Sequence, residues 1–345
     1  MKMGRQKIAL CFLLLFLCAG GAAGQDVKLL APRSMGKWGI RAGNYSGITP
    51  LGGGRYAVVD DKYPYEGFFV FRITQDSVTG QITGVTNEGF RGGGQRHAKD
   101  LDAEGVACRA ADSTVWISRE SDQRILAYDT GGRSVGCELA VPDGMKSGNI
   151  APNYGFEALA YDAGRGVFWA MTENVLRADG KPLSPGMHTS ACLRLQSFGA
   201  DGLPGAQYVY RPGLPQAKRK GRAYAFGVVA LWAQADGSLW VMEREIDVAR
   251  RILRSKTHIH IYKVWPAVGN SPHRVEEKTL EKQLVASFFT RMRLFRPKFA
   301  NYEGMCEGMT LPDGRRTMLL VADSQNGYGN RVCHLRDLIR VLVFR

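Results

Sequence analysis

The sequence lacks several features that would assign a class of protein directly. Its longest apolar run, residues 8–19, has 12 residues, whereas a helix that spans a membrane needs about 20. No H-E-x-x-H pattern, no phosphate-binding G-x-x-x-x-G-K-[ST] loop and no zinc-type cysteine spacing occurs. With 14 prolines, 42 glycines and no short period, a collagenous or low-complexity chain is excluded.

The composition is that of a globular protein. The 345 residues are 45% hydrophobic and 23% charged, so the chain can bury a large core as one domain or two. The formal charge of +14 raises nucleic acid or an anionic membrane surface as a partner. The distribution of the charged residues along the chain tests both hypotheses.

The first 24 residues have the pattern of a secretory signal peptide. Lys2, Arg5 and Lys7 precede the apolar run, and Ala22-Ala23-Gly24 supplies small residues for cleavage. We therefore expect an exported protein, periplasmic or secreted, with a single domain over 25–345. Loss of the leader lowers the charge from +14 to +11, and export argues against nucleic acid as the partner. We expect a monomer without a transmembrane segment; a lipid anchor at Cys18 is disfavoured by the large Leu17 before it.

Five cysteines remain after the leader, namely Cys108, Cys137, Cys192, Cys306 and Cys333. An odd number cannot all pair, although disulfides are permitted in an exported protein. Cys108 and Cys137 are the favoured pair, and burial as small apolar side chains accounts for most of the others.

A repeat runs through the whole chain. Each copy has a short apolar strand, a turn with Gly or Asp, a second apolar strand and an acidic residue; the copies start at Ser46, Ala103, Phe156, Val229 and Cys306. A third apolar strand follows each pair, and a fourth follows the first four copies. This pattern predicts an all-β fold, a β-propeller of five or six four-stranded blades.

The ends of the chain complete the predicted ring. No fourth strand follows the fifth repeat. The segment VKLLAPR, which begins at residue 27, has the apolar pattern expected of the missing strand. We therefore expect pairing of the N- and C-terminal strands. Residues 246–256 have helical spacing and predict a short amphipathic helix on the rim.

The repeat places acidic residues at one mouth of the central channel. Glu104, Glu157 and Glu307 open first strands, and each precedes an acid by 16 residues. The start of the first strand and the end of the second lie side by side in an antiparallel hairpin. We therefore expect the acidic residues of all repeats to face the same mouth of the channel. Further acids are expected just outside these glutamates: Asp60, Asp61, Glu120, Glu173, Glu243, Glu245 and Asp323.

Such a cluster of carboxylates favours a bound divalent cation, calcium foremost, because hard cations prefer oxygen ligands. The expected ligands are Asp61, Glu104, Asn153, Glu157, Glu173, Glu307 and Asp323. A structural alternative remains open, in which these acids cap strand ends or pair with Lys62, Arg119 and Arg244.

Basic clusters in the loops are predicted to surround the same mouth, at residues 218–222, 244–256 and 291–298. An acidic floor beneath a basic rim suits a small anionic ester or phosphate bound through a cation. Lys62, Arg119 and Arg244 are the substrate-binding candidates. Glu104, Glu157, Glu307 and His97 are the catalytic candidates, His97 as a general base or phosphate contact.

The segments DAEGVA (102–107), NYGFEALAYD (153–162) and YEGMCEGMTLPDG (302–314) resemble the phytase-like family described as "esterase-like activity of phytase". The resemblance covers residues 39–344 and implies an exported propeller, calcium-assisted, that acts on phosphate or other esters. The family pattern falls on Glu104, Glu157 and Glu307; it departs at Ser46 and Val229, where a glutamate is missing. The resemblance identifies no nucleophile in this sequence.

Two functions therefore remain open from the sequence. The first is a metal-dependent hydrolase of phosphate or other esters. The second is a non-catalytic propeller that binds a ligand or a protein at the same mouth, since propellers serve both purposes.

Overall fold

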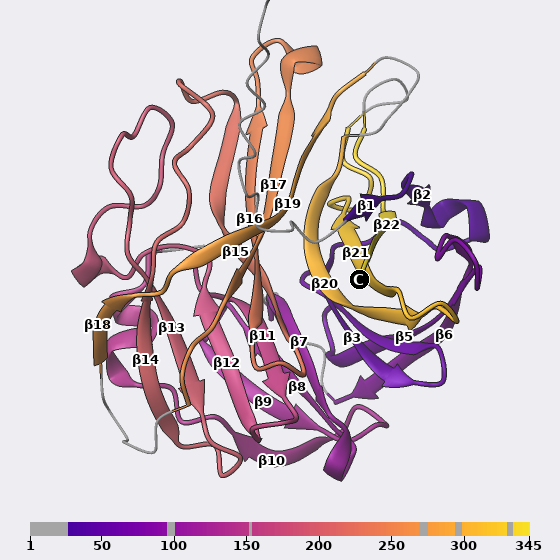
Figure 1. The fold of residues 1–345 in the computed structure, drawn as a ribbon, viewed down its shortest axis with the longest axis horizontal. Coiled ribbons are helices and arrows are strands. Elements are labelled where there is room, and N and C mark those ends of the chain that lie inside the picture. The colour runs from indigo at the N-terminus through magenta and orange to yellow at the C-terminus, as the bar shows by residue number, and fades with distance from the viewer. Residues whose placement is uncertain (1–26, 95–100, 152–153, 269–274, 294–298, 330–333) are drawn as a thin grey trace, which may run out of the picture.

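Five β-sheets surround a central channel in the computed structural model of the chain (Figure 1). The structure describes residues 27–94, 101–151, 154–268, 275–293, 299–329 and 334–345. The prediction of an all-β propeller is confirmed, and the blade number is five.

Each blade is an antiparallel sheet whose first strand lies along the channel. Blade 1 contains β3 (Tyr45–Gly52), β4 (Arg55–Asp60), β5 (Glu66–Gln75) and β6 (Ile82–Gly93). Blade 2 contains β7 (Ala103–Arg109), β8 (Thr114–Arg119), β9 (Arg124–Tyr128) and β10 (Ser134–Glu138). Blade 3 contains β11 (Phe156–Asp162), β12 (Val167–Thr172), β13 (Leu193–Phe198) and β14 (Pro204–Tyr210). Blade 4 contains β15 (Ala223–Ala233), β16 (Leu239–Val248), β17 (Lys256–Val264) and β19 (Lys282–Arg291). Blade 5 contains β20 (Asn301–Thr310), β21 (Arg316–Asp323) and β22 (Leu338–Phe344).

The two ends of the chain close the ring in blade 5, as predicted. β1 (Lys28–Leu29) and β2 (Arg33–Ser34) both pair antiparallel with β22. A second link ties blades 3 and 4, because β18 (Val275–Thr279), from the connection between β17 and β19, pairs parallel with β14.

One hydrophobic cluster fills each of the five spaces between neighbouring blades. Between blades 4 and 5, the rings of Trp240 and Phe344 lie with centroids 4.8 Å apart. Between blades 2 and 3, Trp116 and Phe168 are 4.7 Å apart. Burial of aromatic side chains in these spaces holds the blades together, since it removes large apolar areas from water.

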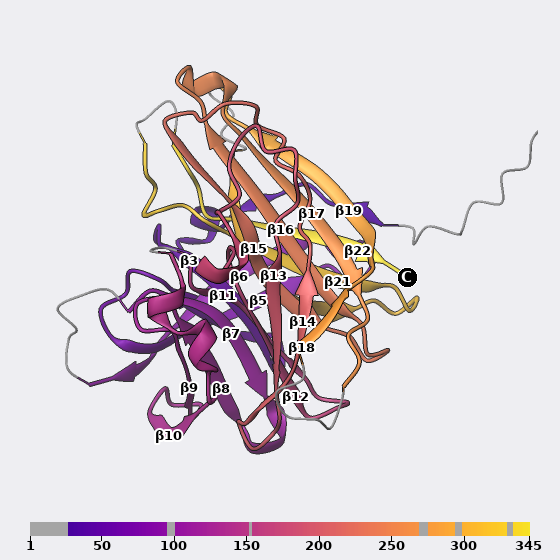
Figure 2. The same cartoon turned by 90° about the vertical axis from the view of Figure 1, so that its left-hand side faces the viewer.

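Blade 4 projects beyond the disc (Figures 1 and 2). β15 begins six residues before Val229, whereas β7 begins one residue before the equivalent Glu104. The extra residues lengthen the blade by roughly 16 Å at about 3.3 Å per residue. The projection carries exposed cations at its free end, among them Arg222, Arg250, Arg251, Arg254, Lys256 and Arg291.

The predicted helix over 246–256 is wrong. β16 continues to Val248, a single 3-10 turn covers Ile252–Arg254, and β17 begins at Lys256. Pairing with β15 and β17 satisfies the backbone of this segment on both sides, which outweighs its helical spacing. The other helical turns are also short 3-10 turns, at Met35–Trp38, Ala110–Asp112, Asp143–Met145, Ser147–Asn149 and Arg177–Asp179.

The favoured disulfide is wrong as well. Cys108 and Cys137 are free cysteines, on the innermost and the outermost strand of blade 2. Three strand spacings separate them, roughly 14 Å, which is too far for a disulfide. Within the described residues, no helix is long and apolar enough to cross a membrane.

Candidate functional site

The first strand of every blade carries a β-bulge at the same level of the channel. The strand register shifts at Tyr45/Gly47, Ala103/Val106, Phe156/Ala158, Val228/Ala230 and Tyr302/Gly304. A bulge re-aims the side chain of the extra residue. The residues at this position, here called the inner ring, are Ser46, Glu104, Glu157, Val229 and Glu303.

Small residues follow the inner ring and bring the strands close together. A Cβ atom on Gly47 would lie 2.3 Å from the carbonyl oxygen of Glu104, and one on Gly105 would lie 2.8 Å from Cβ of Leu159. Glycine is therefore required at these two contacts between innermost strands, whereas Ala158 and Ala230 stand at the same position in blades 3 and 4. The channel is narrow at this level and separates two mouths.

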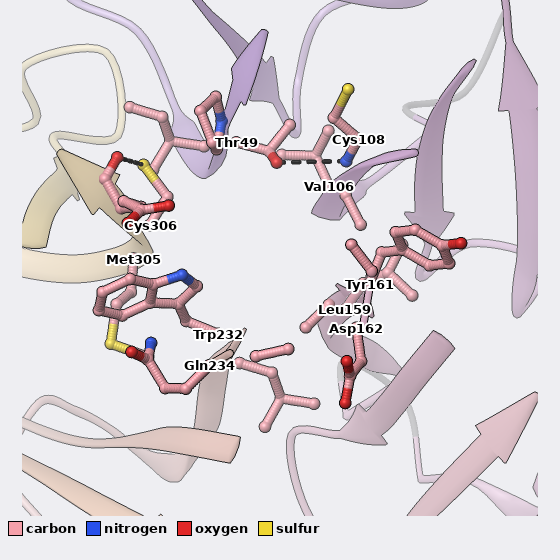
Figure 3. A pocket seen from close by; sticks show the side chains of 18 of the residues that line it. Thr49, Val106, Cys108, Leu159, Tyr161, Asp162, Trp232, Gln234, Met305 and Cys306 are labelled. Carbon is pink, nitrogen blue, oxygen red and sulfur yellow. Dashed lines mark hydrogen bonds between the residues drawn. The ribbon is translucent and has the colours of Figure 1, made fainter. Parts of the chain in front are cut away.

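One mouth holds a cavity of about 460 Å³ with a mainly apolar lining (Figure 3). Val106, Leu159 and Met305 form its floor, and Trp232 and Tyr161 line its sides. We call this cavity the apolar funnel.

The opposite mouth holds an outer ring of charged residues, one per blade: Asp61, Glu120, Glu173, Arg244 and Asp323. Each pairs through the backbone with the residue two positions before the inner-ring residue. The amide of Glu173, for example, donates to Gly155 O at 2.8 Å, and that of Asp61 donates to Asn44 O at 3.1 Å. The same structural position thus occurs once in each of the five blades. An acidic residue occupies it in four blades, and an arginine occupies it in blade 4.

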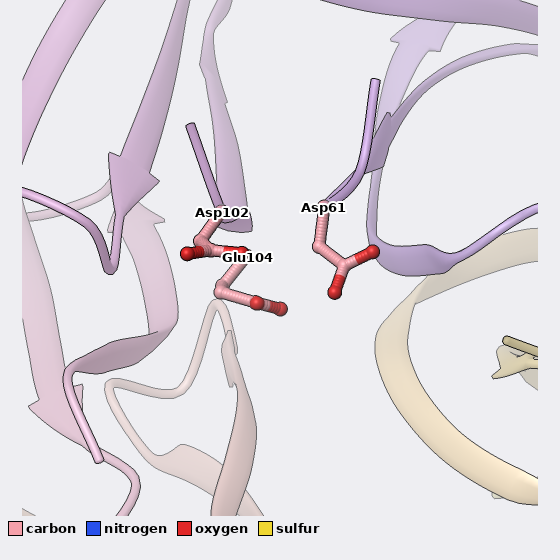
Figure 4. Close-up of side chains that lie close together, drawn as sticks. All are labelled: Asp61, Asp102 and Glu104. Atoms are coloured by element: carbon pink, nitrogen blue, oxygen red, sulfur yellow. The ribbon is translucent and has the colours of Figure 1, made fainter. Parts of the chain in front are cut away.

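The inner and outer rings enclose a cavity of about 280 Å³, here called the acidic cavity. Its lining comprises Asp61, Lys62, Asp102, Glu104, Glu120, Glu157, Glu303, Asp323 and Gln325. Seven carboxylates thus face one lysine. Figure 4 shows Asp61, Asp102 and Glu104 converging from two blades.

Two carboxylate triplets have the geometry of a cation site. Oxygen atoms of Asp61, Asp102 and Glu104 lie within 4.8 Å of one another, as do those of Glu104, Glu120 and Glu157. Glu104 belongs to both triplets. Carboxylates at such distances suit calcium, which takes six to eight oxygen ligands with water completing the shell.

Several of these carboxylates lack partners among the described residues. Oδ1 of Asp61 is buried without a hydrogen bond. Glu104 and Glu157 are 6% and 8% exposed, and no described side chain or amide donates to their carboxylates. Buried charged oxygens without donors are costly, so the residues present fit a bound divalent cation.

The pKa values follow from this crowding. Burial raises the pKa of Glu104 well above its ordinary value, and repulsion by Asp61 and Glu303 raises it further. Burial, then repulsion by Glu104, raises the pKa of Glu157 in the same way. Burial raises the pKa of Asp61 to about 7 despite the opposing effect of Lys62. Without a cation the cluster therefore retains protons near neutral pH.

Lys62 lines the acidic cavity, and Arg244 lies beside it. The ammonium group of Lys62 lies 2.9 Å from Asp61 and also pairs with Asp102. The guanidinium of Arg244 lies 2.7 Å from Glu173 and 3.4 Å from Glu303. Two of the three predicted substrate-binding residues, Lys62 and Arg244, therefore lie at this mouth.

Arg119 does not line the acidic cavity. It pairs with Glu66 at 2.9 Å and with Asp122, and so joins blades 1 and 2. Neither partner belongs to the predicted acidic cluster, so Arg119 pairs with other acids than the structural alternative expected.

The placement of Glu307 with the other inner glutamates is wrong. Glu307 pairs with Met318 across the hairpin, forms an ion pair with Arg316 at 3.1 Å and lines the apolar funnel. Glu303 takes its place, because Asn301 pairs with Asp323. The hairpin of blade 5 is longer than those of blades 2 and 3 and has a second bulge between Glu307 and Thr310. The segment YEGMCEGM contains two Glu-Gly pairs, and the spacing of 16 residues before Asp323 pointed to the second, Glu307, instead of the first, Glu303.

The outer acids of blade 4 also differ from expectation. Because side chains alternate along a strand, Arg244 faces the channel while Glu243 and Glu245 point to the other side. Glu243 accepts a hydrogen bond from Tyr210 Oη at 2.5 Å and pairs with Lys282 at 2.6 Å. The amides of Gln216 and Ala217 donate to Glu245. These two acids anchor a loop.

Glu173 and Asp323, predicted as metal ligands, belong to the outer ring, but Glu173 is held by Arg244. Asn153 and His97 lie outside the described residues. One G-x-S-x-G sequence occurs at 132–136, but Ser134 begins the outer strand β10 rather than a strand-to-helix turn, which the nucleophile of a serine esterase requires.

The solved structures to which the chain is similar are distant in sequence. The PQQ-bound aldose sugar dehydrogenase from Streptomyces coelicolor shares 16% identity, with 93% of this chain and 99% of that chain covered and a TM-score of 0.38. The endo-arabinase from Bacteroides thetaiotaomicron shares 11% identity, with 87% and 93% covered and a TM-score of 0.43. No curated protein matches the sequence.

A family model matches residues 40–325, most of the propeller, and its description is "esterase-like activity of phytase". The matched region contains both rings of the acidic cavity. The chain therefore belongs to the phytase-like family.

Proposed function

We propose that this protein is an exported hydrolase of phosphate or other esters that depends on a divalent cation, calcium foremost, in the acidic cavity. The observation that carries the proposal is the gathering of seven carboxylates around one lysine in a cavity of about 280 Å³. The family description supports ester hydrolysis as the reaction class.

The cation would be held by the two triplets that share Glu104, namely Asp61, Asp102, Glu120 and Glu157 with Glu104 itself. When bound, such an ion polarises a phosphoryl or carbonyl oxygen and lowers the pKa of a coordinated water. Without it, the carboxylates would repel an anionic substrate.

The chain's own residues supply orientation and proton transfer. Lys62 lines the acidic cavity and Arg244 lies beside it, against Glu303; in the proposed reaction both orient an anionic ester by charge. Glu303 is held by Asn301 Nδ2 at 2.7 Å and lies beyond the two triplets. In the proposed reaction it accepts a proton as a water oxygen attacks the ester, and the ester bond to the leaving oxygen breaks.

The test uses the purified protein with calcium and with chelator. We expect calorimetry to show calcium binding, and turnover of p-nitrophenyl phosphate, p-nitrophenyl acetate or phytate to require the ion. Glu104→Gln and Glu157→Gln should lower calcium affinity and kcat by at least about tenfold each. Glu307→Gln is the matched control, because this glutamate lies at the other mouth, and it should change neither.

Absence of turnover on all three substrates would overturn the hydrolase. Calcium binding without turnover would instead support the alternative function, a propeller that binds a ligand at this mouth.

Export is part of the proposal and rests on the leader pattern of residues 1–24. Expression of the full chain in a secreting bacterial host should yield a periplasmic or secreted protein that begins at Gln25. An uncleaved cytoplasmic product would contradict export.

A further inference from the structure

A second cavity opens beside the acidic cavity, between the projecting part of blade 4 and the loops of blade 5. Its volume is about 460 Å³. Apolar side chains make up most of its lining, above all Ile246, Val248, Ile252, Met292, Phe299 and Leu335. We call it the apolar cleft. Its size and lining are those of a small-molecule site.

The apolar cleft and the acidic cavity share a wall. Glu303 and Gln325 line both cavities. Arg244 lines the apolar cleft while its guanidinium contacts Glu173 and Glu303. A molecule that fills both cavities would therefore pass directly over Arg244 and Glu303.

Two arginines line the cleft side of the junction. Arg244 is the outer ring's only cation; its guanidinium pairs with Glu173 and Glu303, but its buried Nε has no hydrogen-bond partner among the described residues. The exposed Arg222 also lines the apolar cleft. Further exposed arginines, Arg250 and Arg251, lie at the end of the same projection. An anionic group at the junction would meet Arg244 on one side and the proposed cation on the other.

We propose that the substrate is an amphipathic ester whose phosphate or carboxyl group lies at the junction and whose apolar group fills the apolar cleft. This inference rests on the proposed function, because it assigns the substrate class of that site. Ile246, Met292, Phe299 and Leu335 are already buried against one another, and Val248 and Ile252 remain partly exposed. A polyanion without apolar surface, such as phytate, would leave these two side chains in water, whereas an aryl or alkyl group there would cover them.

The test compares ligands that share the phosphate but differ in the apolar group. In the presence of calcium, calorimetry should give a Kd for 1-naphthyl phosphate at least about tenfold lower than for methyl phosphate. Where turnover occurs, kcat/KM should rise in the same order. Ile252→Trp, which fills the cleft from its rim, should abolish the difference between the two ligands.

Leu253→Trp is the matched control. Leu253 lies on the same 3-10 turn and is 47% exposed, and it does not line the apolar cleft. This variant should retain the preference for the naphthyl group.

The outcomes separate this inference from the proposed function. Hydrolysis of all phosphate esters with equal affinity would overturn the amphipathic substrate and leave the hydrolase standing. Preferential binding of 1-naphthyl phosphate that is lost in Ile252→Trp, without any turnover, would support the apolar cleft and overturn the hydrolase. Equal loss of preference in both tryptophan variants would overturn the assignment of the cleft.

Discussion

At the scale of single residues, Arg244 distinguishes blade 4 from the other blades. The equivalent positions hold Asp61, Glu120, Glu173 and Asp323. Arg244 is 5% exposed, and its buried charge is matched by Glu173 and Glu303. Because Val229 also replaces an acid in the inner ring, blade 4 contributes no carboxylate to the cavity, and the proposed cation belongs to blades 1 to 3.

Arg244→Met should destabilise the calcium-free protein by about 3–5 kcal/mol at pH 8, since it leaves two buried carboxylates without their cation. The loss should be smaller at pH 5, where these carboxyls take up protons. Urea unfolding at both pH values measures the effect. Arg254→Met, at an exposed position of the same blade, should change stability little; an equal loss at pH 5 and pH 8 would contradict the assignment.

Calcium affinity should rise with pH. Burial raises the pKa of Asp61 to about 7, so a proton occupies this carboxyl at lower pH and must leave before the ion binds. Loss of this proton predicts an affinity at least about tenfold higher at pH 8 than at pH 6, since burial also raises the pKa values of Glu104 and Glu157. Calorimetry in buffers of different ionisation enthalpy counts the protons released. An affinity independent of pH would mean that Asp61 is not a ligand.

At the scale of elements, the bulge in each first strand and the small residue after it position the inner ring. Gly47 has no positive φ, so its requirement is one of space alone: its Cβ would lie 2.3 Å from the carbonyl oxygen of Glu104. The backbone that carries Glu104 is therefore held by close contact with blade 1.

Gly47→Ala should push these strands apart, lower the free energy of unfolding by about 1–3 kcal/mol and weaken calcium binding through Glu104. The control is Gly93→Ala, because a Cβ there meets nothing within 4 Å. Denaturant unfolding and calcium calorimetry report the two effects. Unchanged calcium affinity in a destabilised Gly47→Ala protein would show that the contact serves folding only.

At the scale of the whole molecule, the ring is closed by short strands at the N-terminus. Val27 and Leu29 pack against the cluster between blades 4 and 5, and Leu30 against that between blades 5 and 1. β1 and β2 also cover the free edge of β22.

A variant without residues 1–34 should therefore melt several degrees lower than one without residues 1–24, because it loses apolar burial and exposes a strand edge. Thermal unfolding followed by circular dichroism measures the difference. Equal melting temperatures would contradict closure by these strands.

The repeat could be predicted from the sequence because each propeller blade is formed by residues that are consecutive in the chain. A four-stranded antiparallel sheet is built from consecutive hairpins, so alternation of apolar residues and turns marks it without any long-range information. Glu104 and Glu157 could be aligned for the same reason, since blades 2 and 3 have hairpins of equal length. The pairing of both chain ends followed from the strand missing in the fifth repeat.

Only the tertiary structure showed which residues occupy the two rings, because hairpin length and side-chain direction determine their positions. The extended hairpin of blade 5 placed Glu303, not Glu307, in the inner ring, and strand register placed Arg244, not Glu243 or Glu245, in the outer ring. Blade number, the absence of the predicted helix and the apolar cleft depend on contacts between segments far apart in the chain. The sequence thus determined the repeated unit, whereas only the closed ring determined which side chains share a cavity, because that depends on how neighbouring blades meet.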